Sequence, residues 1–245
     1  MQPTNFIAIP ESVLPNGLTV PAFRVARYLA TAGELNPAGA ACTRLGDRAA
    51  RQAAVTEDGY PWVSINYAAA RKAAAAAGFA LITESQALAL AWMIAQQPAN
   101  WTGGAVGNGA LFQGLHADSV DCPMPASYQP PAENERRWHR LSNGENIFDF
   151  AGNAYTWVFD DIQGDEHGVV AKGIAADSIT LQSPYPSGVC GVGYRPDGAR
   201  DWSGYALVRG GCCGSESCAG VFNLGNGWPG SAYVDVGFRC TLAGL

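Results

Sequence analysis

Helical patterns lie within the first 100 of the 245 residues, and short strand-like segments rich in glycine and aromatic residues follow them. Because a parallel α/β sheet needs helices and strands to alternate, this order predicts an α+β fold. No fixed-period repeat and no flexible linker divides the sequence, so we expect one domain over residues 1–245. A chain of this length can bury a full core without disulfide staples.

Start signals place two helices in the alanine-rich half of the chain. Thr83 and Gln86 form a capping box, in which the threonine side chain accepts a hydrogen bond from a backbone amide and the glutamine side chain reaches back. An earlier helix begins after Ser64 or Asn66, either of which can cap it, and ends at Gly78. These signals predict two consecutive helices.

The other segments divide into loops, strands and one further helical stretch. Residues 118–135 are proline-rich and predict a surface loop, while the Ala/Arg-rich residues 38–54 favour a helix. Apolar segments bounded by turn-forming residues predict strands at residues 6–10, 19–25, 141–160, 205–211 and 234–240.

Charge and hydropathy exclude two classes of partner. The chain has 21 acidic and 15 basic residues, a net charge of −6, whereas a nucleic-acid-binding protein needs a basic patch. The longest apolar runs, residues 73–82 and 87–95, are shorter than the roughly 20 residues that cross a bilayer. The first ten residues show no signal peptide, so we expect synthesis in the cytoplasm and, for any role outside it, assembly into a particle or assisted export.

Seven cysteines and three histidines give no clear metal or disulfide signature. The odd cysteine count, the absence of C-x-x-C spacing and the lack of histidines at ligand spacing predict free thiols instead. Four carboxylates in residues 160–166 could form a calcium loop, but their spacing differs from an EF-hand and favours a solvated acidic loop. We therefore expect neither a resident metal nor a cofactor.

The C-terminal segment, residues 201–239, has an unusual composition for a core-forming stretch. It is crowded with Gly, Ser, Asn, Asp, Tyr and Cys and has few long aliphatic residues in its middle. Such residues suit an adaptable contact surface, as in antibody loops, although a plain pair of glycine-rich loops is the alternative. Trp157 is expected in the core, whereas Trp228 is compatible with an exposed binding role or with anchoring its loop.

A set of motifs in a fixed order resembles the formylglycine-generating-enzyme-like domains. Residues 148–157 resemble their "GNVWEW" signature, Val208-Arg-Gly-Gly211 their "RGG" strand, and Val236-Gly-Phe-Arg-Cys240 their closing "GFR" strand. Residues 62–70 and 81–84 resemble two helix starts of the same family. The resemblance covers residues 55–240 and implies a variant C-type lectin fold, with two helices packed on small twisted antiparallel sheets and long loops.

Within that superfamily, the C-terminal layout is similar to variable proteins of diversity-generating retroelements. Adenine-directed mutagenesis rewrites the C-terminal segment of those proteins, so that one scaffold displays many binding surfaces. Their typical order is Arg-Gly-Gly-Ser-Trp, a loop, Ala-Gly-Val-Phe, a second loop and Gly-Phe-Arg. Here Arg209-Gly-Gly211, Ala219-Gly-Val-Phe222 and Gly237-Phe-Arg239 stand in that order, with Cys212 and Cys213 in place of Ser-Trp.

The resemblance implies which residues bind ligand. An AAC codon altered only at its adenines can encode Gly, Ser, Cys, Tyr, Asp, Ala, Val or Asn, but neither Glu nor Trp, so Glu216 and Trp228 would be fixed. The implied variable, ligand-binding residues within the region 201–240 are Cys213, Gly214, Ser215, Ser217, Cys218, Gly225, Asn226, Gly230, Ser231, Tyr233 and Asp235. Tyr233 and the fixed Trp228 would be the best anchors, because aromatic side chains dominate binding energy.

The function implied is ligand display without catalysis, on a phage or prophage particle or on a cell surface. The partner would be a macromolecule, a protein or a glycan, on a target cell. Because large side chains are scarce among the variable residues, we expect weak binding or a need for several copies.

An oxidase is the alternative. Formylglycine-generating oxidases bind copper through two cysteines five positions apart, and Cys213 and Cys218 have that separation. Soft thiolates suit Cu(I). However, the Arg-Tyr-Arg and Ala-Ala-Arg elements that follow those cysteines in the oxidases are absent here.

Overall fold

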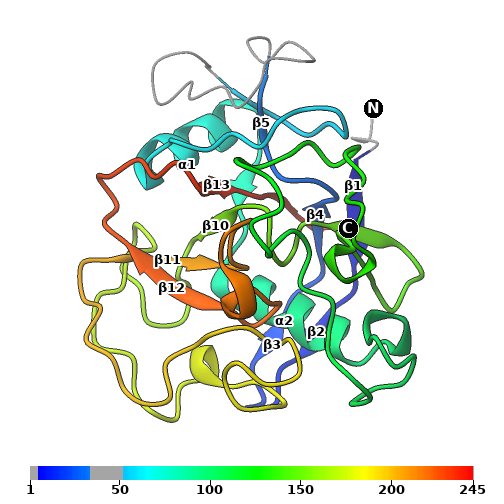
Figure 1. Cartoon of the computed structure of the whole chain (residues 1–245). Helices are drawn as coiled ribbons and strands as arrows, with labels where there is room; N and C mark the ends of the chain where they lie inside the picture. The colour runs from blue at the N-terminus through cyan, green and yellow to red at the C-terminus, as the bar shows by residue number, and fades with distance from the viewer. Residues whose placement is uncertain (1–4, 34–51, 245) are drawn as a thin grey trace.

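The computed structural model describes residues 5–33 and 52–244, in which a four-stranded antiparallel sheet brings the two ends of the chain together. Its strands run in the order β1 (Phe6–Ile9), β4 (Phe23–Ala26), β14 (Cys240–Ala243) and β7 (Ala80–Leu81). The first and last strands of the described residues, β1 and β14, are thus hydrogen-bonded to opposite edges of β4, and Figure 1 shows β1 beside β4.

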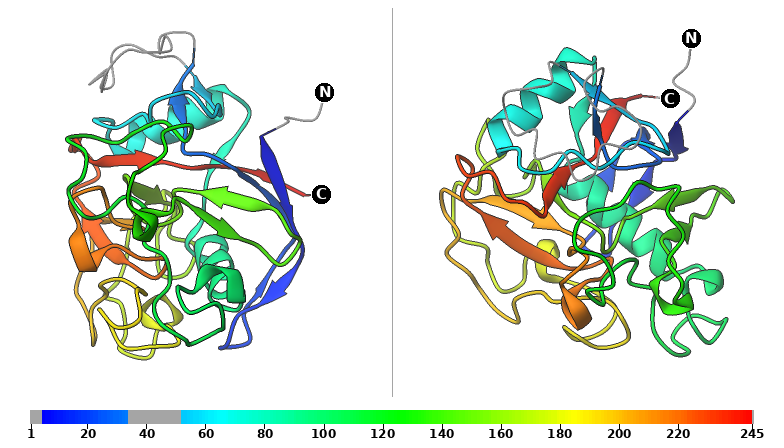
Figure 2. Two further views of the ribbon diagram at one scale, coloured as in Figure 1. Left: turned by 45° about the vertical axis from the view of Figure 1, so that its right-hand side comes forward. Right: turned by 45° about the horizontal axis from the view of Figure 1, so that its top comes forward.

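A second four-stranded sheet contains the C-terminal segment. Its order is β12 (Leu224–Gly227), β11 (Ala206–Arg209), β10 (Tyr155–Val158) and β13 (Val236–Phe238). The first three strands pair antiparallel, but β13 lies parallel to β10, which the expectation of purely antiparallel sheets did not include. Only one residue separates β13 from β14, so the chain passes directly from this sheet into the first one (Figure 2).

Shorter elements complete the described part of the fold. Three ladders of two strands join β2 (Ser12–Val13) to β3 (Thr19–Val20), β5 (Thr31–Ala32) to β6 (Ala53–Ala54), and β8 (Trp138–Arg140) to β9 (Asn146–Phe148). Single 3₁₀ turns lie at η2 (Pro98–Asn100), η3 (Glu133–Glu135), η4 (Ile179–Leu181) and η5 (Glu216–Cys218). Residues 118–135 contain only such a turn, as their proline content predicts.

Both expected helices are present and begin at the predicted caps. For α1 (Tyr67–Ala76), the side chain of Asn66 accepts a hydrogen bond from the amide of Ala69 at 2.8 Å, so Asn66 rather than Ser64 is the cap. For α2 (Glu84–Ala95), the capping box between Thr83 and Gln86 forms in both directions. Neither helix is long and apolar enough to cross a membrane, within the residues described.

The second sheet separates two groups of buried side chains. Val158 and Leu207 face one cluster with α2, while their neighbours Trp157 and Val208 face the other with α1. This alternation follows from the two-residue period of a strand. The sheet therefore has a helix on each face, with α1 above it and α2 below it in the view of Figure 1.

The arginines of the RGG and GFR motifs connect the two large sheets to other parts of the core. Arg209 forms a buried ion pair with Glu84, the first residue of α2. Arg239, between β13 and β14, donates to the carbonyl oxygens of Ala26 at 2.8 Å and Asp149 at 3.0 Å. Both side chains are almost fully buried, so the segment between them is attached to the core at each end.

The structure corrects several sequence expectations. Ala53–Ala54 forms β6 rather than the end of a helix, and residues 38–51 of that expected helix lie outside the described residues. The single strand expected at 19–25 is interrupted at Pro21, which leaves β3 and β4 as separate strands. Cys122 is disulfide-bonded, so the expectation of free thiols was wrong for it. An odd cysteine count excludes complete pairing but not one bond.

The expected solvated acidic loop is wrong for Asp160 alone, since Asp161, Asp165 and Glu166 are exposed. Asp160 is fully buried and accepts hydrogen bonds from the amides of Ile162 and Gln163. Asp161 accepts from the amide of Ser85 at 2.9 Å, in the first turn of α2. These carboxylates support the fold, because negative charge stabilises the first turn of a helix.

Candidate ligand-binding surface

The first predicted binding segment connects β11 to β12 and contains the turn η5. Gly214, Ser217 and Cys218 are exposed, and Ser215 is half-buried. Cys213 is only 8% exposed; its amide donates to the carbonyl of Asn153 at 3.1 Å. The structure therefore places three predicted residues on the surface and ties the other two into the scaffold.

The second predicted segment is a strand followed by a loop rather than one long loop. Gly225 and Asn226 belong to β12, opposite Val208 and Leu207 of β11, and both are half-buried. The loop begins at Trp228 and ends at β13. Within it, Gly230 is exposed, whereas Ser231, Tyr233 and Asp235 are half-buried.

The two segments meet at Asp235. Burial and, to a smaller extent, the nearby Asp235 carboxylate raise the pKa of the Cys212 thiol, so these two groups of the two segments lie close together. The hydroxyl of Ser215 lies 3.2 Å from that of Tyr155, whose amide donates to the Asp235 carbonyl at 2.9 Å. Cys212, Ser215, Tyr155 and Asp235 thus hold the end of the second segment against the start of the first.

The glycines of this region fall into two groups. At Gly211, φ is +87° and an added Cβ would lie 2.7 Å from the Cα of Ala219, so both the backbone and the packing require glycine. At Gly214, φ is outside the left-handed region, and the nearest atom to an added Cβ is an Asp118 oxygen at 3.5 Å. Gly230 is similar, with the indole nitrogen of Trp228 at 3.4 Å. Gly214 and Gly230 therefore have room for a Cβ, and neither has a backbone conformation that requires glycine.

Tyr233 supports the loop more than it faces solvent. Its ring packs on Trp157 with 5.9 Å between centroids, and its hydroxyl accepts a hydrogen bond from the Trp228 amide at 3.0 Å. A Cβ on Gly227 would lie 3.1 Å from the same ring. Tyr233 therefore fixes the backbone conformation around Trp228.

Trp228 itself is exposed and has an aromatic neighbour that the sequence did not indicate. Its side chain is 54% exposed and packs edge-to-face on Tyr205, with 5.6 Å between centroids. The pairing of Ala206 with Gly227 places Tyr205 across from Trp228, one step beyond the ladder. Because that pairing depends on β12, which has no strand-like sequence, nothing local in the sequence reveals this contact.

Cys213 and Cys218, the two cysteines of the oxidase alternative, lie in different surroundings. Burial is the main reason that the pKa of the Cys213 thiol is raised to about 11, and Cys212, Asp118 and Asp235 contribute to the same increase. The Cys213 thiol is therefore protonated at neutral pH in the metal-free protein. Cys218, by contrast, is exposed in η5. Among the described residues, no group of three or more His, Cys, Asp or Glu side chains is placed to hold a metal ion.

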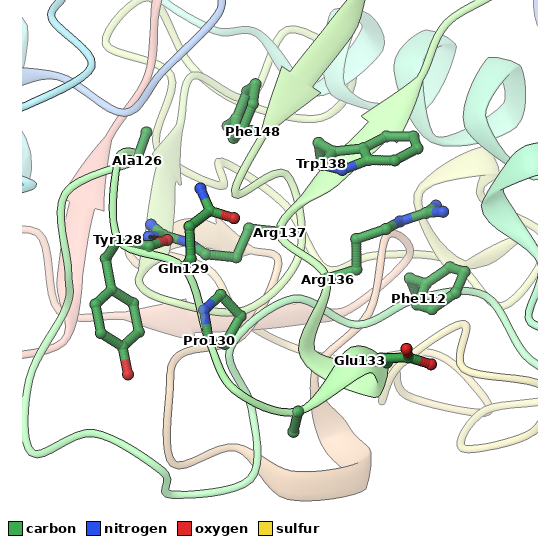
Figure 3. Close-up of a pocket in the computed structure, with 11 residues that line it drawn as sticks. Phe112, Ala126, Tyr128, Gln129, Pro130, Glu133, Arg136, Arg137, Trp138 and Phe148 are labelled. Carbon is green, nitrogen blue, oxygen red and sulfur yellow. Dashed lines mark hydrogen bonds between the residues drawn. The ribbon is translucent and has the colours of Figure 1, made fainter.

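A separate hollow of about 310 Å³ lies between residues 126–133 and the β8–β9 hairpin (Figure 3). The guanidinium of Arg136 is stacked between the rings of Phe112 and Trp138, at 3.7 and 3.8 Å from their centroids. Arg137, at the same site, is paired with Asp149. None of the predicted ligand-binding residues lines this hollow.

Comparison with known proteins places this geometry in a structural class. The sequence matches no protein-family model, and no curated protein sequence matches it. Variable protein 1 of Treponema denticola superposes with a TM-score of 0.50 at 14% identity, over 98% of this chain and 95% of that protein. The chain has the C-type lectin fold.

Two other solved structures match at lower TM-scores. PvdO from Pseudomonas aeruginosa is 16% identical, with a TM-score of 0.47 over 97% of this chain and 90% of its own. The Major Tropism Determinant M1 variant is 14% identical, with a TM-score of 0.45 over 98% of this chain. The present chain spans 55% of that protein's length. In this C-type lectin fold, the predicted binding residues lie on and between β11, β12 and β13.

Proposed function

We propose that this protein binds a ligand through a diversified surface in residues 201–240 and performs no chemistry there. One observation carries the proposal. Gly214 and Gly230, which the codon argument marks as variable, are free of any backbone or packing requirement for glycine, whereas Gly211 of the fixed motif is not. Small residues that no structural need explains are what a rewritten surface would contain.

The scaffold suits such a role because change at the surface is separated from the core. Arg209 and Arg239 attach the strands on either side of the region to buried carboxylate and carbonyl oxygens. Substitutions at exposed positions away from such features usually alter stability by less than about 0.5 kcal/mol. Side chains at Gly214, Ser217 or Gly230 can therefore change affinity while the fold persists.

The finer parts of the proposal concern partner and place. We propose a macromolecular partner on a target cell, and a position on a phage particle or a cell surface. The disulfide at Cys122 supports a location outside the reducing cytoplasm, because disulfides persist in oxidising surroundings. A single domain spanning residues 1–245 remains our prediction.

The genome around the coding sequence provides the direct test. We would sequence the flanking DNA and search for a second, near-identical copy of the stretch encoding residues 201–240. The proposal expects that copy to differ only at its adenines, with AAC codons opposite Gly214, Gly230 and Tyr233. A flanking region that holds no such copy would contradict diversification.

A further inference from the structure

We propose that Tyr205 and Trp228 form a constant apolar anchor for protein partners, beside which the variable residues set specificity; this rests on the proposed function. The two side chains are 37% and 54% exposed, and their rings meet at 78°. A Trp codon cannot arise from AAC by changes at its adenines, so Trp228 would be fixed. Tyr205 precedes the RGG strand and is not among the implied variable residues, so every variant would carry the pair.

The backbone on both sides of the pair is fixed. The Trp228 carbonyl accepts a hydrogen bond from the Ser231 amide at 3.0 Å, a backbone contact that does not depend on which side chain residue 231 carries. The Tyr205 carbonyl accepts from the Val170 amide at 2.9 Å. Binding therefore requires little ordering of these residues, which is the main condition for an effective anchor.

A layer of buried rings supports the pair from below. A Cβ on Gly227 would lie 2.6 Å from the six-membered ring of Trp157, so strand β12 rests directly on that indole. Trp157 in turn packs against Tyr67 at 5.9 Å and donates its indole proton to the Ile65 carbonyl at 3.0 Å. The exposed pair thus sits on rigid, closely packed core.

The variable residues are placed to modify what the anchor binds. A side chain at Gly230 would begin 3.4 Å from the Trp228 indole nitrogen and would extend or cover the apolar surface. Asn226 and Ser231 flank the same residue along the chain. Trp and Tyr dominate the binding energy of protein interfaces, while their neighbours adjust complementarity.

The surroundings of the pair favour a protein over a glycan. Val234, in the same loop, is 58% exposed, and Pro229, Gly230 and Ala232 offer no side-chain hydrogen bonds. The Tyr233 hydroxyl is already engaged by the Trp228 amide. The exposed apolar surface of Trp228 and Val234 suits an apolar side chain of a protein, which would displace water from it.

The test uses two display libraries of the full chain, one with the native pair and one with Tyr205→Ser and Trp228→Ser. Both are selected against immobilised lysozyme, streptavidin and a mannan polysaccharide. Each library randomises the exposed small residues Gly214, Ser217, Cys218 and Gly230, together with the half-buried Ser231. Every binder is then remade with Trp228→Ala, Tyr205→Ala and, as a control, Val13→Ala, an exposed residue of β2. Thermal unfolding checks that each variant folds. If Trp228→Ala does not fold, the affinity of the Tyr205→Ala variant decides the outcome.

We expect protein binders from the native library, with affinities that fall about tenfold or more on removal of either ring and stay unchanged in the control. Binders that arise equally from both libraries and ignore these substitutions would overturn the anchor while leaving the proposed function intact. Binders to mannan alone would overturn the protein partner. If neither library yields any binder, the proposed function fails and the anchor fails with it.

Discussion

Arg209 of β11 reaches the carboxylate of Glu84 at the start of α2, with its Nε 2.7 Å from Oε2. The Glu84 side chain is fully buried and that of Arg209 is 5% exposed. A third hydrogen bond joins Arg209 to the Thr180 carbonyl at 3.0 Å. One side chain therefore connects the second sheet, α2 and the long connection between β10 and β11.

The substitution Glu84→Gln should destabilise the fold by about 3–5 kcal/mol, because it leaves the Arg209 charge buried without a counter-ion. Urea unfolding at pH 7 measures the loss. The control is Asp197→Asn, which breaks the exposed pair with Arg200 and should cost less than about 1 kcal/mol. Equal losses in the two variants would show that the buried pair does not support the sheet.

Glycine substitutions should separate the scaffold from the display surface. Gly211→Ser forces a side chain into a left-handed backbone and against Ala219, so we expect a loss of at least about 2 kcal/mol. Gly214→Ser, three residues later, should change stability by less than about 0.5 kcal/mol. Thermal unfolding of both variants decides between these outcomes. A large loss at Gly214 would remove the observation on which the proposed function rests.

The thiols should react at very different rates. With a pKa of about 11, only roughly one thousandth of Cys213 is thiolate at pH 8, and the side chain is buried. Cys218 is exposed and should be alkylated first, as mass spectrometry of the labelled native protein can show. Cys218→Ser should abolish the fast phase of alkylation. Unfolding in urea should expose Cys213 and make its slow alkylation fast. Rapid labelling of Cys213 would instead revive the copper-oxidase alternative.

A buried histidine predicts how stability depends on pH. Burial lowers the pKa of His139 to about 4, while the unfolded chain keeps the ordinary value near 6.5. The unfolded state therefore binds a proton between pH 6.5 and 4 that the folded state does not. The free energy of unfolding should fall by about 3 kcal/mol over that window from this residue and change no further below it.

Urea titrations at several pH values of the wild type and of His139→Gln measure this contribution as the difference between the two curves. The variant retains an amide that can donate to the Phe112 carbonyl, as His139 does at 2.8 Å. His167→Gln, at an exposed histidine, should follow the wild type. An unchanged acid dependence in His139→Gln would show that another group is responsible.

The sequence predicts best those elements whose conformation depends on residues that are close together along the chain. The caps at Asn66 and Thr83 bond to residues three positions away, so both helices could be placed from local signals. Strand β12 could not, because Gly225 and Asn226 have low strand propensity and owe their conformation to backbone pairing with β11. Asp161 similarly resembles a residue of a plain surface loop, and only the structure shows its hydrogen bond to the Ser85 amide of α2.

The same distinction applies to the binding surface. The motif order indicates which segment is exposed, but whether a residue such as Tyr233 faces solvent depends on Trp157, far away in sequence. Tyr205 could not be selected at all, since only the register of β11 with β12 brings it to Trp228. Residues whose role depends on a contact with another strand can be identified only from the structure.

The passage of the chain from β13 into β14 has a consequence for how variants would be screened. These last strands complete both large sheets, and both are encoded after every proposed variable position. A copying error that shifts the reading frame or introduces a stop codon would delete them, and with them the pairing partners of β4, β7 and β10. Folding itself would then remove defective variants, because only chains that retain β13 and β14 could form both sheets and display the binding surface.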